Sequence, residues 1–233
     1  MAAKTAILDT FDEAADWRAR SLRFPAIATR GARTLKRVVD VVVVLVAFLL
    51  TLPLFVLVAV AILLESGHPV FFRQQRVGRG DSRFDLWKFR TMVVDGDELL
   101  EGYLAENPEA AREWRVSRKL RQDPRVTRVG RLLRRTSLDE LPQLWNILRG
   151  EMSIAGPRPI VEQEIAQYGT VFPLYTMARP GLTGLWQVSG RNSISYPRRV
   201  ELDRQYVQNW SPALDLWILW RTVGVVVQGT GAY

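Results

Sequence analysis

Residues 41–64 read VVVVLVAFLLTLPLFVLVAVAILL, a run without a charged side chain. About 20 predominantly apolar residues suffice for a helix to cross the hydrocarbon core of a bilayer. The run begins about 40 residues from the N-terminus and no small-residue cleavage site follows it, so it does not read as a conventional signal peptide. We therefore expect a membrane helix here and not a buried core helix.

Pro53 lies in the middle of this run. A proline inside a helix removes one backbone hydrogen bond and costs about 3 kcal/mol unless something compensates, and in lipid that compensation has to be local. The Thr51 hydroxyl is a candidate for it. Two outcomes stay open: a kinked single span, or a helix that breaks, turns and leaves the membrane on the side where it entered.

Basic residues flank the run on both sides: Lys36, Arg37, Arg73, Arg76 and Arg79. Because basic residues mark the cytoplasmic side of a membrane segment, this symmetry favours the re-entrant hairpin over the crossing. Asp40, at the edge of the run, follows Lys36 and Arg37 at spacings that suit ion pairs on a helix. Asp40 can therefore pair with either of these two residues.

The composition of the chain narrows its chemistry. There is no cysteine, which excludes disulfides, thiolate metal sites and a cysteine nucleophile. The one histidine, His68, follows the apolar run, so a Ser-His-Asp triad or a multi-histidine metal cluster would have to depend on it. A metal held by carboxylates alone would be a hard ion such as Mg²⁺ or Mn²⁺. The net charge of +8 indicates anionic partners: nucleic acid, lipid head groups or phosphorylated substrates.

A β-hairpin is predicted directly after the apolar run. PVFFRQQRV at 69–77 and RFDLWKFRTM at 83–92 flank GRGDS, whose glycines suit a tight connection. Alternation along the second strand places Phe84, Leu86, Lys88 and Arg90 on one face. The two cations suggest an edge that faces phosphate, although a solvated face is equally common.

Residues 95–150 are predicted to be helical, and the basic residues concentrate among them. Residues 112–135 hold ten Arg or Lys against two acids. Arg131, Arg134 and Arg135 recur at spacings of three and four, which gives one helix a basic face. An ordinary solvated face and a face that contacts phosphates or anionic lipid are equally good interpretations.

Two later segments carry simpler signals. RPGLTGLWQVSGR at 179–191 is rich in Gly, Pro, Ser and Thr, which predicts a loop with backbone N–H groups available to anions. Ser211 followed by Pro212 predicts the start of a final helix, with Ser as the N-cap. The tryptophans of that helix favour a position at the membrane interface.

The stretch SLDELPQLWN at 137–146 is the strongest candidate for chemistry. Ser137 with Glu140 matches a capping box, and Asp139 falls in the first turn, so the start of a helix is a complete explanation by itself. The Pro at 142 leaves the first residue of that helix open. Both acids, however, follow the densest basic segment of the chain, and a carboxylate beside arginines stays ionised, as a nucleophile or metal ligand must.

Three motifs carry a resemblance to a known family: KFRTM at 88–92, DPRVTRVGRLLRRTSLDELPQLWNILRGEMSIAGPRP at 123–159 and PGLTGLWQVSGR at 180–191. They resemble the bacterial sugar transferase family, the monotopic phosphoglycosyl transferases of polyprenyl phosphate. The resemblance covers the chain from about residue 33 to the C-terminus. It implies a helix-rich α/β fold with a Pro-broken re-entrant membrane helix, a small cytoplasmic domain with a β-hairpin, and amphipathic interfacial helices.

The organisation expected from this resemblance has three parts. A polar N-terminal tail covers 1–32, the re-entrant membrane helix covers 33–66, and the cytoplasmic catalytic domain covers 67–233. The expected location is the bacterial inner (cytoplasmic) membrane, with the catalytic domain on its cytoplasmic face. Some relatives carry further N-terminal spans, and the chain reads as the short form.

The resemblance also implies a two-step reaction that requires Mg²⁺. Asp139 would attack the sugar-proximal phosphate of a UDP-sugar, UMP would leave, and polyprenyl phosphate would then take the sugar 1-phosphate. Glu140 would be a Mg²⁺ ligand. The basic and polar residues matched to the family's substrate-binding positions, or placed near them by alternation, are Lys88, Arg90, Arg134, Arg158, Gln187 and Arg191.

Two other classes of function fit part of these features. A basic membrane-anchored binding protein of nucleic acid or anionic lipid would suit the charge, but no helix-turn-helix, RNP or zinc pattern is present, so nucleic acid is not an expected partner. A glycosyl transferase that moves the sugar without its phosphate would release UDP instead of UMP. The sugar, with galactose or glucose favoured, and homo-oligomerisation are left open.

Overall fold

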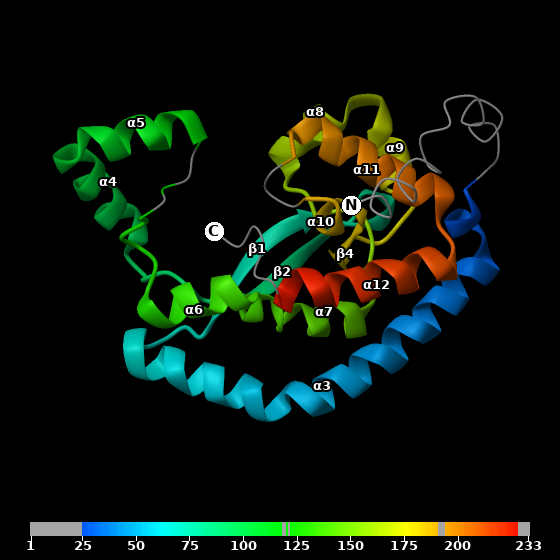
Figure 1. Cartoon of the computed structure of the whole chain (residues 1–233), viewed down its shortest axis with the longest axis horizontal. Coiled ribbons are helices and arrows are strands. Elements are labelled where there is room, and N and C mark those ends of the chain that lie inside the picture. Colours follow the sequence, from blue (N-terminus) through cyan, green and yellow to red (C-terminus); the bar gives the residue numbers. More distant parts are fainter. Residues whose placement is uncertain (1–24, 118–119, 121, 191–193, 228–233) are drawn as a thin grey trace.

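The computed structural model describes residues 25–117, 120, 122–190 and 194–227. The protein is helix-rich, with two small two-stranded sheets in the described residues. Helix α3 runs along one side of the molecule, the β1–β2 hairpin lies at its centre, and α4 and α5 project from one end (Figure 1). The elements are η1 Ala26–Ala28, α3 Arg30–Ser66, β1 Phe71–Val77, η2 Arg79–Asp81, β2 Arg83–Phe89, α4 Gly96–Glu106, α5 Pro108–Ser117, α6 Arg128–Thr136, η3 Leu138–Glu140, α7 Gln143–Arg149, β3 Ser153–Ala155, η4 Glu162–Glu164, α8 Ile165–Tyr168, η5 Gly169–Val171, α9 Phe172–Tyr175, β4 Gly181–Thr183, α10 Leu185–Val188, α11 Tyr196–Asn209 and α12 Pro212–Val227.

Helix α3 contains the whole apolar run. It passes through Pro53 without leaving the helical conformation, so the predicted break is not present, and Figure 1 shows the helix bowed. Pro53 cannot donate to the carbonyl of Leu49 one turn earlier. The Thr51 hydroxyl does not replace that bond, since it donates to the Ala47 carbonyl at 2.7 Å. The irregularity is therefore absorbed by curvature over several turns.

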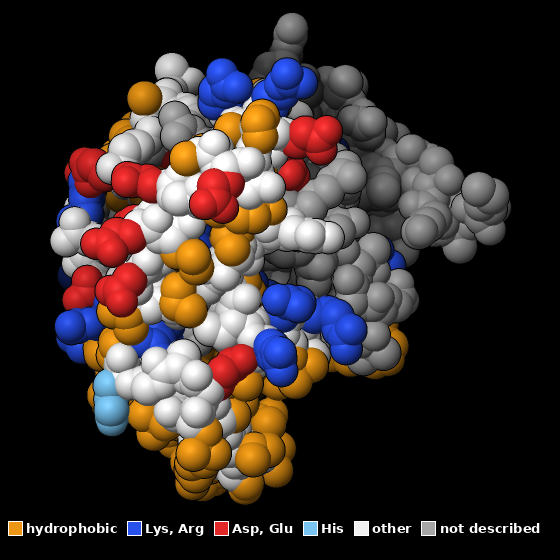
Figure 2. Space-filling view, turned by 90° about the vertical axis from the view of Figure 1, so that its left-hand side faces the viewer, with side chains coloured by type: hydrophobic (Ala, Val, Ile, Leu, Met, Phe, Trp, Pro, Cys, Tyr) orange, Lys and Arg blue, Asp and Glu red, His pale blue; other side chains and the backbone are white. Residues whose placement is uncertain are grey.

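One face of α3 remains uncovered and apolar. By length and composition this helix could cross a membrane, and most of its apolar window lies exposed. Figure 2 shows hydrophobic side chains gathered at the lower end of the molecule, where Figure 1 places α3. Exposed apolar faces of this size are unusual on soluble proteins, and this one is consistent with membrane association. The exposed large hydrophobic residues of α3 are Leu35, Val38, Val39, Val42, Val43, Leu45, Val46, Leu49, Leu50, Leu52, Val56, Leu57, Val60 and Leu64.

The first half of α3 is fixed to the rest of the molecule by packing and polar contacts. Val44 is fully buried in a cluster with Leu86 and Ile147. The Arg37 guanidinium donates to the Ile147 carbonyl and, at 2.6 Å, to the Leu148 carbonyl at the end of α7. These bonds satisfy carbonyls that a helix end leaves free.

The possible ion pair of Asp40 with Lys36 or Arg37 is not formed among the described residues. The Asp40 carboxylate accepts a hydrogen bond from the Ile154 backbone N–H at 3.1 Å. Lys36 instead pairs with Asp215 on α12, at 2.5 Å. Tertiary packing determines both contacts. Asp215 lies far from Lys36 in the sequence, and the two residues meet because α12 returns to the start of α3.

The second half of α3 contacts the same body. Val58 and Ile62 are buried against Phe89 of the hairpin and Leu133 of α6. The Glu65 carboxylate accepts from two backbone N–H groups at the start of α6, with the shortest bond at 2.7 Å. A carboxylate at a helix N-terminus satisfies free donors and complements the helix dipole. Both ends of α3 are thus anchored to one structure.

The predicted hairpin is confirmed. Strands β1 and β2 pair antiparallel, with Val77 opposite Arg83 and Phe72 opposite Lys88. Gly80 in the connection has a φ of 66°, a conformation that glycine adopts at little cost. Phe84 and Leu86 are buried as the alternation predicts.

The segment 179–191 is more regular than predicted. Its residues form β4, which pairs parallel with β3, and the single turn of α10. A Cβ on Gly181 would lie 2.1 Å from the Gly156 nitrogen, so the glycines permit a backbone approach that no side chain allows. The glycines of this segment predict a loop, but in the structure they allow the backbones of β4 and of the residues after β3 to pack closely.

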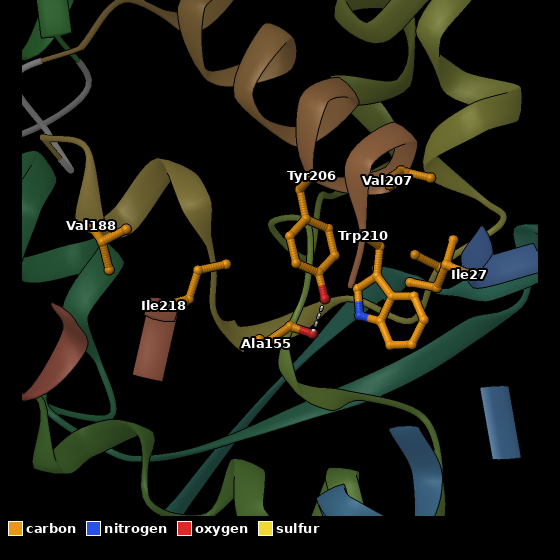
Figure 3. Close-up of a cluster of buried hydrophobic side chains, with 8 residues drawn as sticks. Ile27, Ala155, Val188, Tyr206, Val207, Trp210 and Ile218 are labelled. Atoms are coloured by element: carbon orange, nitrogen blue, oxygen red, sulfur yellow. Dashed lines mark hydrogen bonds between the residues drawn. The ribbon is translucent and has the colours of Figure 1, made fainter. Parts of the chain in front are cut away.

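The final helix begins as predicted, with the Leu214 N–H donating to the Ser211 hydroxyl at 3.2 Å. Its start packs on a buried cluster shown in Figure 3, where the Tyr206 hydroxyl donates to the Ala155 carbonyl at 2.9 Å. Tyr206 and Trp210 also donate to Asp215. Asp215, whose side chain is 15% exposed, therefore joins α3, α11 and α12.

Candidate active site

Asp139 and Glu140 lie on a tight turn between two helices. The predicted helical segment 95–150 is divided into α4, α5, α6 and α7, and η3 follows α6 directly. Ser137 ends α6 in the left-handed conformation, with a φ of 58°, and its side chain caps nothing. The predicted capping box is therefore wrong, because Ser137 precedes η3 and ends α6 at the same time, and its side chain makes no cap hydrogen bond. Helix α7 begins only at Gln143.

The Lys88 ammonium group joins the two carboxylates. Its Nζ atom lies 2.8 Å from Glu140 Oε1 and 3.6 Å from Asp139 Oδ2. The Asp139 side chain is 13% exposed and that of Glu140 36% exposed, so the first is sheltered and the second faces solvent. Strand β2 and turn η3 thus bring together a cation and two acids that are distant in sequence.

Burial raises the pKa of Asp139, and the neighbouring Glu140 charge raises it further, while Lys88 and Arg134 oppose the rise. The net direction is upward, opposite to the one expected for a carboxylate beside arginines. The cost of removing the carboxylate from water outweighs the nearby cations. The pKa of Lys88 is also raised, because Glu140 and Asp139 overcome the lowering effect of burial.

Arg134 of α6 lies beside this group. Its Nε atom donates to the Thr91 hydroxyl at 2.9 Å, and burial lowers its pKa, while Asp139 and Asp123 oppose that change. The basic face predicted for this helix therefore turns one arginine toward the acids. The structure brings together Lys88, Arg134, Asp139 and Glu140.

Arg158 belongs to a neighbouring basic group. Its backbone N–H donates to the buried Asp203 carboxylate, and its Nη2 atom lies 3.6 Å from Glu164. Arg76 of β1 donates to the Pro159 carbonyl at 2.9 Å and lies 4.0 Å from the same glutamate. Burial lowers the pKa of Arg76, and the Arg158 charge adds to this, while the Glu140 charge opposes it.

Arg76 therefore connects Arg158 with the Lys88 group, and the predictions missed it as a site residue. The hairpin register was the available signal. With a five-residue connection, pairing 77 with 83 places Arg76 on the same face as Lys88. Burial raises the pKa of Asp203 to about 7, against the lowering effect of Tyr168 and the Arg158 N–H, so this acid is a buried support for the Arg158 loop.

Gln187 lies on α10. The Gln187 amide donates to the Leu182 carbonyl at 3.3 Å, within its own segment. Arg191 lies outside the described residues.

Arg90 has a different environment from the one expected of a substrate-binding residue. It follows β2 and is 7% exposed, and its guanidinium donates to the carbonyls of Ser66, Gly67 and His68 at 2.7–2.9 Å. These carbonyls lie at the C-terminal end of α3, where a helix leaves them without partners of its own. The hydrogen bonds give Arg90 the role of fixing α3 to the hairpin.

Arg90→Met is therefore expected to lower the stability of the protein by about 3 kcal/mol, since several charge-assisted hydrogen bonds are lost and the carbonyls stay buried. The melting temperature in detergent should fall by several degrees. Arg73→Met on the same hairpin is the control. The Arg73 guanidinium lies 5.1 Å from the centre of the Trp87 ring and not against the end of α3, so this replacement should lower the melting temperature less. An unchanged melting temperature combined with weaker donor binding would assign Arg90 to the substrate instead.

Asp139 and Glu140 are suitable ligands for Mg²⁺ in a restricted sense. Within the described residues, no three His, Asp or Glu side chains converge as a metal cage. Mg²⁺, however, commonly binds through one or two carboxylates and takes its remaining ligands from water and substrate phosphates. The Lys88 ammonium already shows that this pair of acids holds a cation. The donor set therefore fits Mg²⁺ bound jointly with a diphosphate.

The family model described as bacterial sugar transferase matches residues 31–229. The exopolysaccharide production protein ExoY of Rhizobium meliloti is 52% identical over 198 residues, which cover 85% of this chain and 88% of that protein.

Two further relatives carry more explicit names. The undecaprenyl-phosphate galactose phosphotransferase of Salmonella typhimurium is 46% identical over 89% of this chain, which spans 43% of that longer protein. The UDP-glucose:undecaprenyl-phosphate glucose-1-phosphate transferase of Caulobacter vibrioides is 43% identical over 85% of this chain and 72% of its own length. The family match runs from residue 31, at the start of α3, to residue 229, just beyond the end of α12. By this match the chain belongs to the bacterial sugar transferase family.

Proposed function

We propose that the protein transfers a sugar 1-phosphate from a UDP-sugar to undecaprenyl phosphate or a similar polyprenyl phosphate and releases UMP. The observation that carries the proposal is the sheltered Asp139 beside Glu140, with Lys88 within 3.6 Å of both. The names of the relatives, which include transferases of galactose and of glucose 1-phosphate to undecaprenyl phosphate, support the same reaction.

The reaction proceeds in two displacements at one phosphorus atom. An Asp139 carboxylate oxygen attacks the sugar-proximal phosphorus, the bond from that phosphorus to the bridging oxygen breaks, and UMP leaves with this oxygen. A phosphate oxygen of the polyprenyl phosphate then attacks the same phosphorus. The bond to Asp139 breaks, the carboxylate is regenerated, and the sugar remains attached through a diphosphate. Lys88 and Arg134 would reduce the repulsion between the carboxylate and the diphosphate.

Glu140, with Asp139, would hold a Mg²⁺ ion. When bound, such an ion would supply positive charge to the diphosphate. The more exposed position of Glu140 suits a ligand shared with an incoming substrate. Asp139, which is more sheltered, suits the nucleophile.

The position of α3 supports a membrane site for this reaction. A 37-residue helix would be about 55 Å long if straight, which exceeds the thickness of a bilayer. Yet both ends of α3 contact the same domain, through Arg37 at one end and Glu65 at the other. A re-entrant helix with both ends on the cytoplasmic face satisfies both facts. Exposed Leu132, Trp145 and Trp220 on α6, α7 and α12 fit helices at the interface.

The test of the function is the released nucleotide. The purified protein, Mg²⁺ and undecaprenyl phosphate in vesicles should release UMP from at least one of UDP-galactose and UDP-glucose, with lipid-linked sugar formed in equal amount. Release of UDP would identify a transferase that moves the sugar without its phosphate. The product in a cell would be the first membrane intermediate of exopolysaccharide or related glycan assembly.

The re-entrant topology predicts that two single cysteines behave alike. Because the chain has no cysteine, Ala26→Cys and Gln75→Cys each give one label site, before and after α3. A membrane-impermeant maleimide should leave both unlabelled in intact cells and label both in opened membranes. Labelling of one position but not the other in intact cells would exclude the re-entrant topology of α3. Pro53→Leu restores the missing N–H, so it should straighten α3 and increase the fraction of molecules in which the labels differ.

A further inference from the structure

Asn146 of α7 is a fully buried polar residue whose side chain is completely engaged. Its Oδ1 atom accepts from the Trp87 backbone N–H at 3.0 Å, and its Nδ2 atom donates to the Asp85 carbonyl and to Glu151 Oε2, both at 2.7 Å. Only one orientation of the amide gives its oxygen a donor and its nitrogen two acceptors, so these contacts fix how the side chain lies. The directed hydrogen bonds, more than the volume of the side chain, are what Asn146 contributes.

Two of these bonds cover the free edge of β2. The hairpin sheet has two strands, so the edge of β2 away from β1 pairs with no further strand among the described residues. The Arg90 N–H, just after β2, donates to the Val70 carbonyl, just before β1, at 2.9 Å. Because backbone groups alternate in direction along an antiparallel pair, those of Asp85 and Trp87 point to the other edge. The Asn146 amide bonds one carbonyl and one N–H there, as a peptide unit of a neighbouring strand would.

Apolar side chains pack the same helix against β2. Leu144 and Ile147 of α7 are buried in one cluster with Leu86 of β2, and Leu141, just before the helix, packs against that cluster. Apolar contacts are not directional, so they bring the two elements together without fixing the position of one along the other. The hydrogen bonds of Asn146 are directional and supply that position.

The two elements that Asn146 joins carry the two parts of the candidate site. Lys88 follows Trp87 on β2, and both acids lie on η3, which shortly precedes α7. The Lys88 Nζ atom lies 2.8 Å from Glu140 and 3.6 Å from Asp139. A shift of β2 relative to α7 would therefore change both of these distances.

The C-terminal end of α7 is fixed by other residues. The Arg179 Nε atom donates to the Gly150 carbonyl at 2.7 Å, and Arg37 donates to the Leu148 carbonyl at 2.6 Å. Neither bond involves β2. The helix is therefore held at this end without Asn146, and the particular effect of Asn146 is on the placement of β2.

We propose that Asn146 is a positioning residue for the transfer reaction, and that it sets the place of Lys88 relative to Asp139 and Glu140 by fixing β2 against α7. The inference rests on the proposed function for the reaction that is affected. Asn146 itself is buried and touches neither substrate nor metal ion in this role. Because a displacement of about 1 Å at a reacting group can lower a rate by about 10²-fold, a small movement of β2 should be visible in turnover.

The first experiment measures the position of Lys88 without turnover. Mass spectrometry follows the rate at which an acylating reagent modifies each lysine, and an ammonium group held against two carboxylates should react slowly. Asn146→Ala should raise the rate at Lys88 by about threefold or more, as expected when a modest ion pair weakens, and leave Lys36, which pairs with Asp215, unchanged. Arg179→Met is the matched control, because it removes a hydrogen bond of α7 but none of β2, so the rate at Lys88 should stay the same.

The second experiment measures UMP release at saturating UDP-sugar and Mg²⁺. Asn146→Ala should lower turnover by about tenfold or more, and Arg179→Met by less than about twofold. Asn146→Ser is the milder variant, because its smaller side chain leaves room for a water between the two backbone groups, and it should change both measurements in the same direction by less.

A combination with Lys88→Arg, which keeps the charge but moves it, separates positioning from stability. If Asn146 acts through Lys88, adding Asn146→Ala to Lys88→Arg should lower turnover less than Asn146→Ala does alone, since the two replacements damage the same contact. Arg179→Met should lower turnover by the same factor in both backgrounds.

Three outcomes would overturn the assignment: an unchanged rate of acylation at Lys88 in a folded Asn146 variant, an equal rise in Arg179→Met, or fully multiplicative effects of Asn146→Ala and Lys88→Arg on turnover. Each would mean that Asn146 contributes only to stability, which the melting temperatures report separately. If acylation of Lys88 rises as expected but the wild type releases no UMP from any UDP-sugar, the proposed function fails, and the placement of Lys88 by Asn146 stands.

Discussion

Asp139→Asn should abolish turnover and, with it, any covalent sugar phosphate on the protein. Asparagine keeps the shape of the side chain but is not a nucleophile at phosphorus, and it cannot form the ion pair with Lys88 that lies at 3.6 Å. The loss of a nucleophile that forms a covalent intermediate commonly reduces the rate by about 10³-fold or more. The turn itself should survive, because the side chain of Asp139 caps no helix in this structure.

The measurement is mass spectrometry after incubation of the protein with UDP-sugar and Mg²⁺ but without lipid. The wild type should carry about one sugar phosphate per active molecule, on the peptide that contains Asp139, as expected for a covalent intermediate. The Asn variant should carry none. Asp81→Asn is the matched control: Asp81 also pairs with a cation, Arg83 at 2.6 Å, and its φ of 63° is one that asparagine tolerates.

An active Asp139→Asn protein would contradict the covalent mechanism, provided that intact mass excludes deamidation back to aspartate. An adduct located on Glu140 would exchange the roles of the two acids. An adduct that forms at the normal rate in both variants would place the nucleophile elsewhere in the chain.

The parts of the fold that depend on local signals could be predicted from the sequence. The hairpin follows from strand alternation and from glycines in the connection, and its observed register agrees. The apolar helix follows from the absence of charge over 41–64. These signals are local because the residues that determine each element lie within it.

The parts that depend on tertiary contacts could not. Lys36 has Asp40 four residues away but pairs with Asp215, since α12 returns to the start of α3 and only packing brings them together. Ser137 has the sequence of an N-cap but ends α6, which already runs to Thr136. A local sequence pattern indicates which contacts are possible, and tertiary packing determines which of them form.

The candidate site also has features that the sequence indicates and features that only the folded structure shows. Asp139 and Glu140 are candidates because they follow a basic segment and lie in a family motif, both of which the sequence shows. The direction in which the pKa of Asp139 is shifted depends on its burial, which the sequence does not show. Arg76 was predictable in principle from the hairpin register. The contact of the Arg199 guanidinium with the Trp186 ring, at 4.4 Å, was not predictable, because the two residues belong to different elements.

Glu140→Gln should lower turnover and raise the Mg²⁺ concentration needed for half-maximal rate by about tenfold or more, as expected when a charged ligand of the ion is lost. Glutamine keeps the length of the side chain and one acceptor oxygen, so the η3 turn and the contact with Lys88 can persist in part. The rate should recover at high Mg²⁺ if weaker metal binding is the main defect.

The experiment titrates Mg²⁺ at saturating UDP-sugar and compares Glu140→Gln with Glu162→Gln. Glu162 is a suitable control because it is an exposed glutamate that pairs with Arg83 at 2.6 Å, and its replacement should leave the Mg²⁺ dependence unchanged. A lower rate with an unchanged Mg²⁺ requirement would mean that Glu140 acts through Lys88, which it holds at 2.8 Å, and not as a metal ligand. Near-normal turnover at ordinary Mg²⁺ would remove Glu140 from both roles. The two properties measured together therefore separate a ligand of the ion from a residue that only orients the ammonium group beside Asp139.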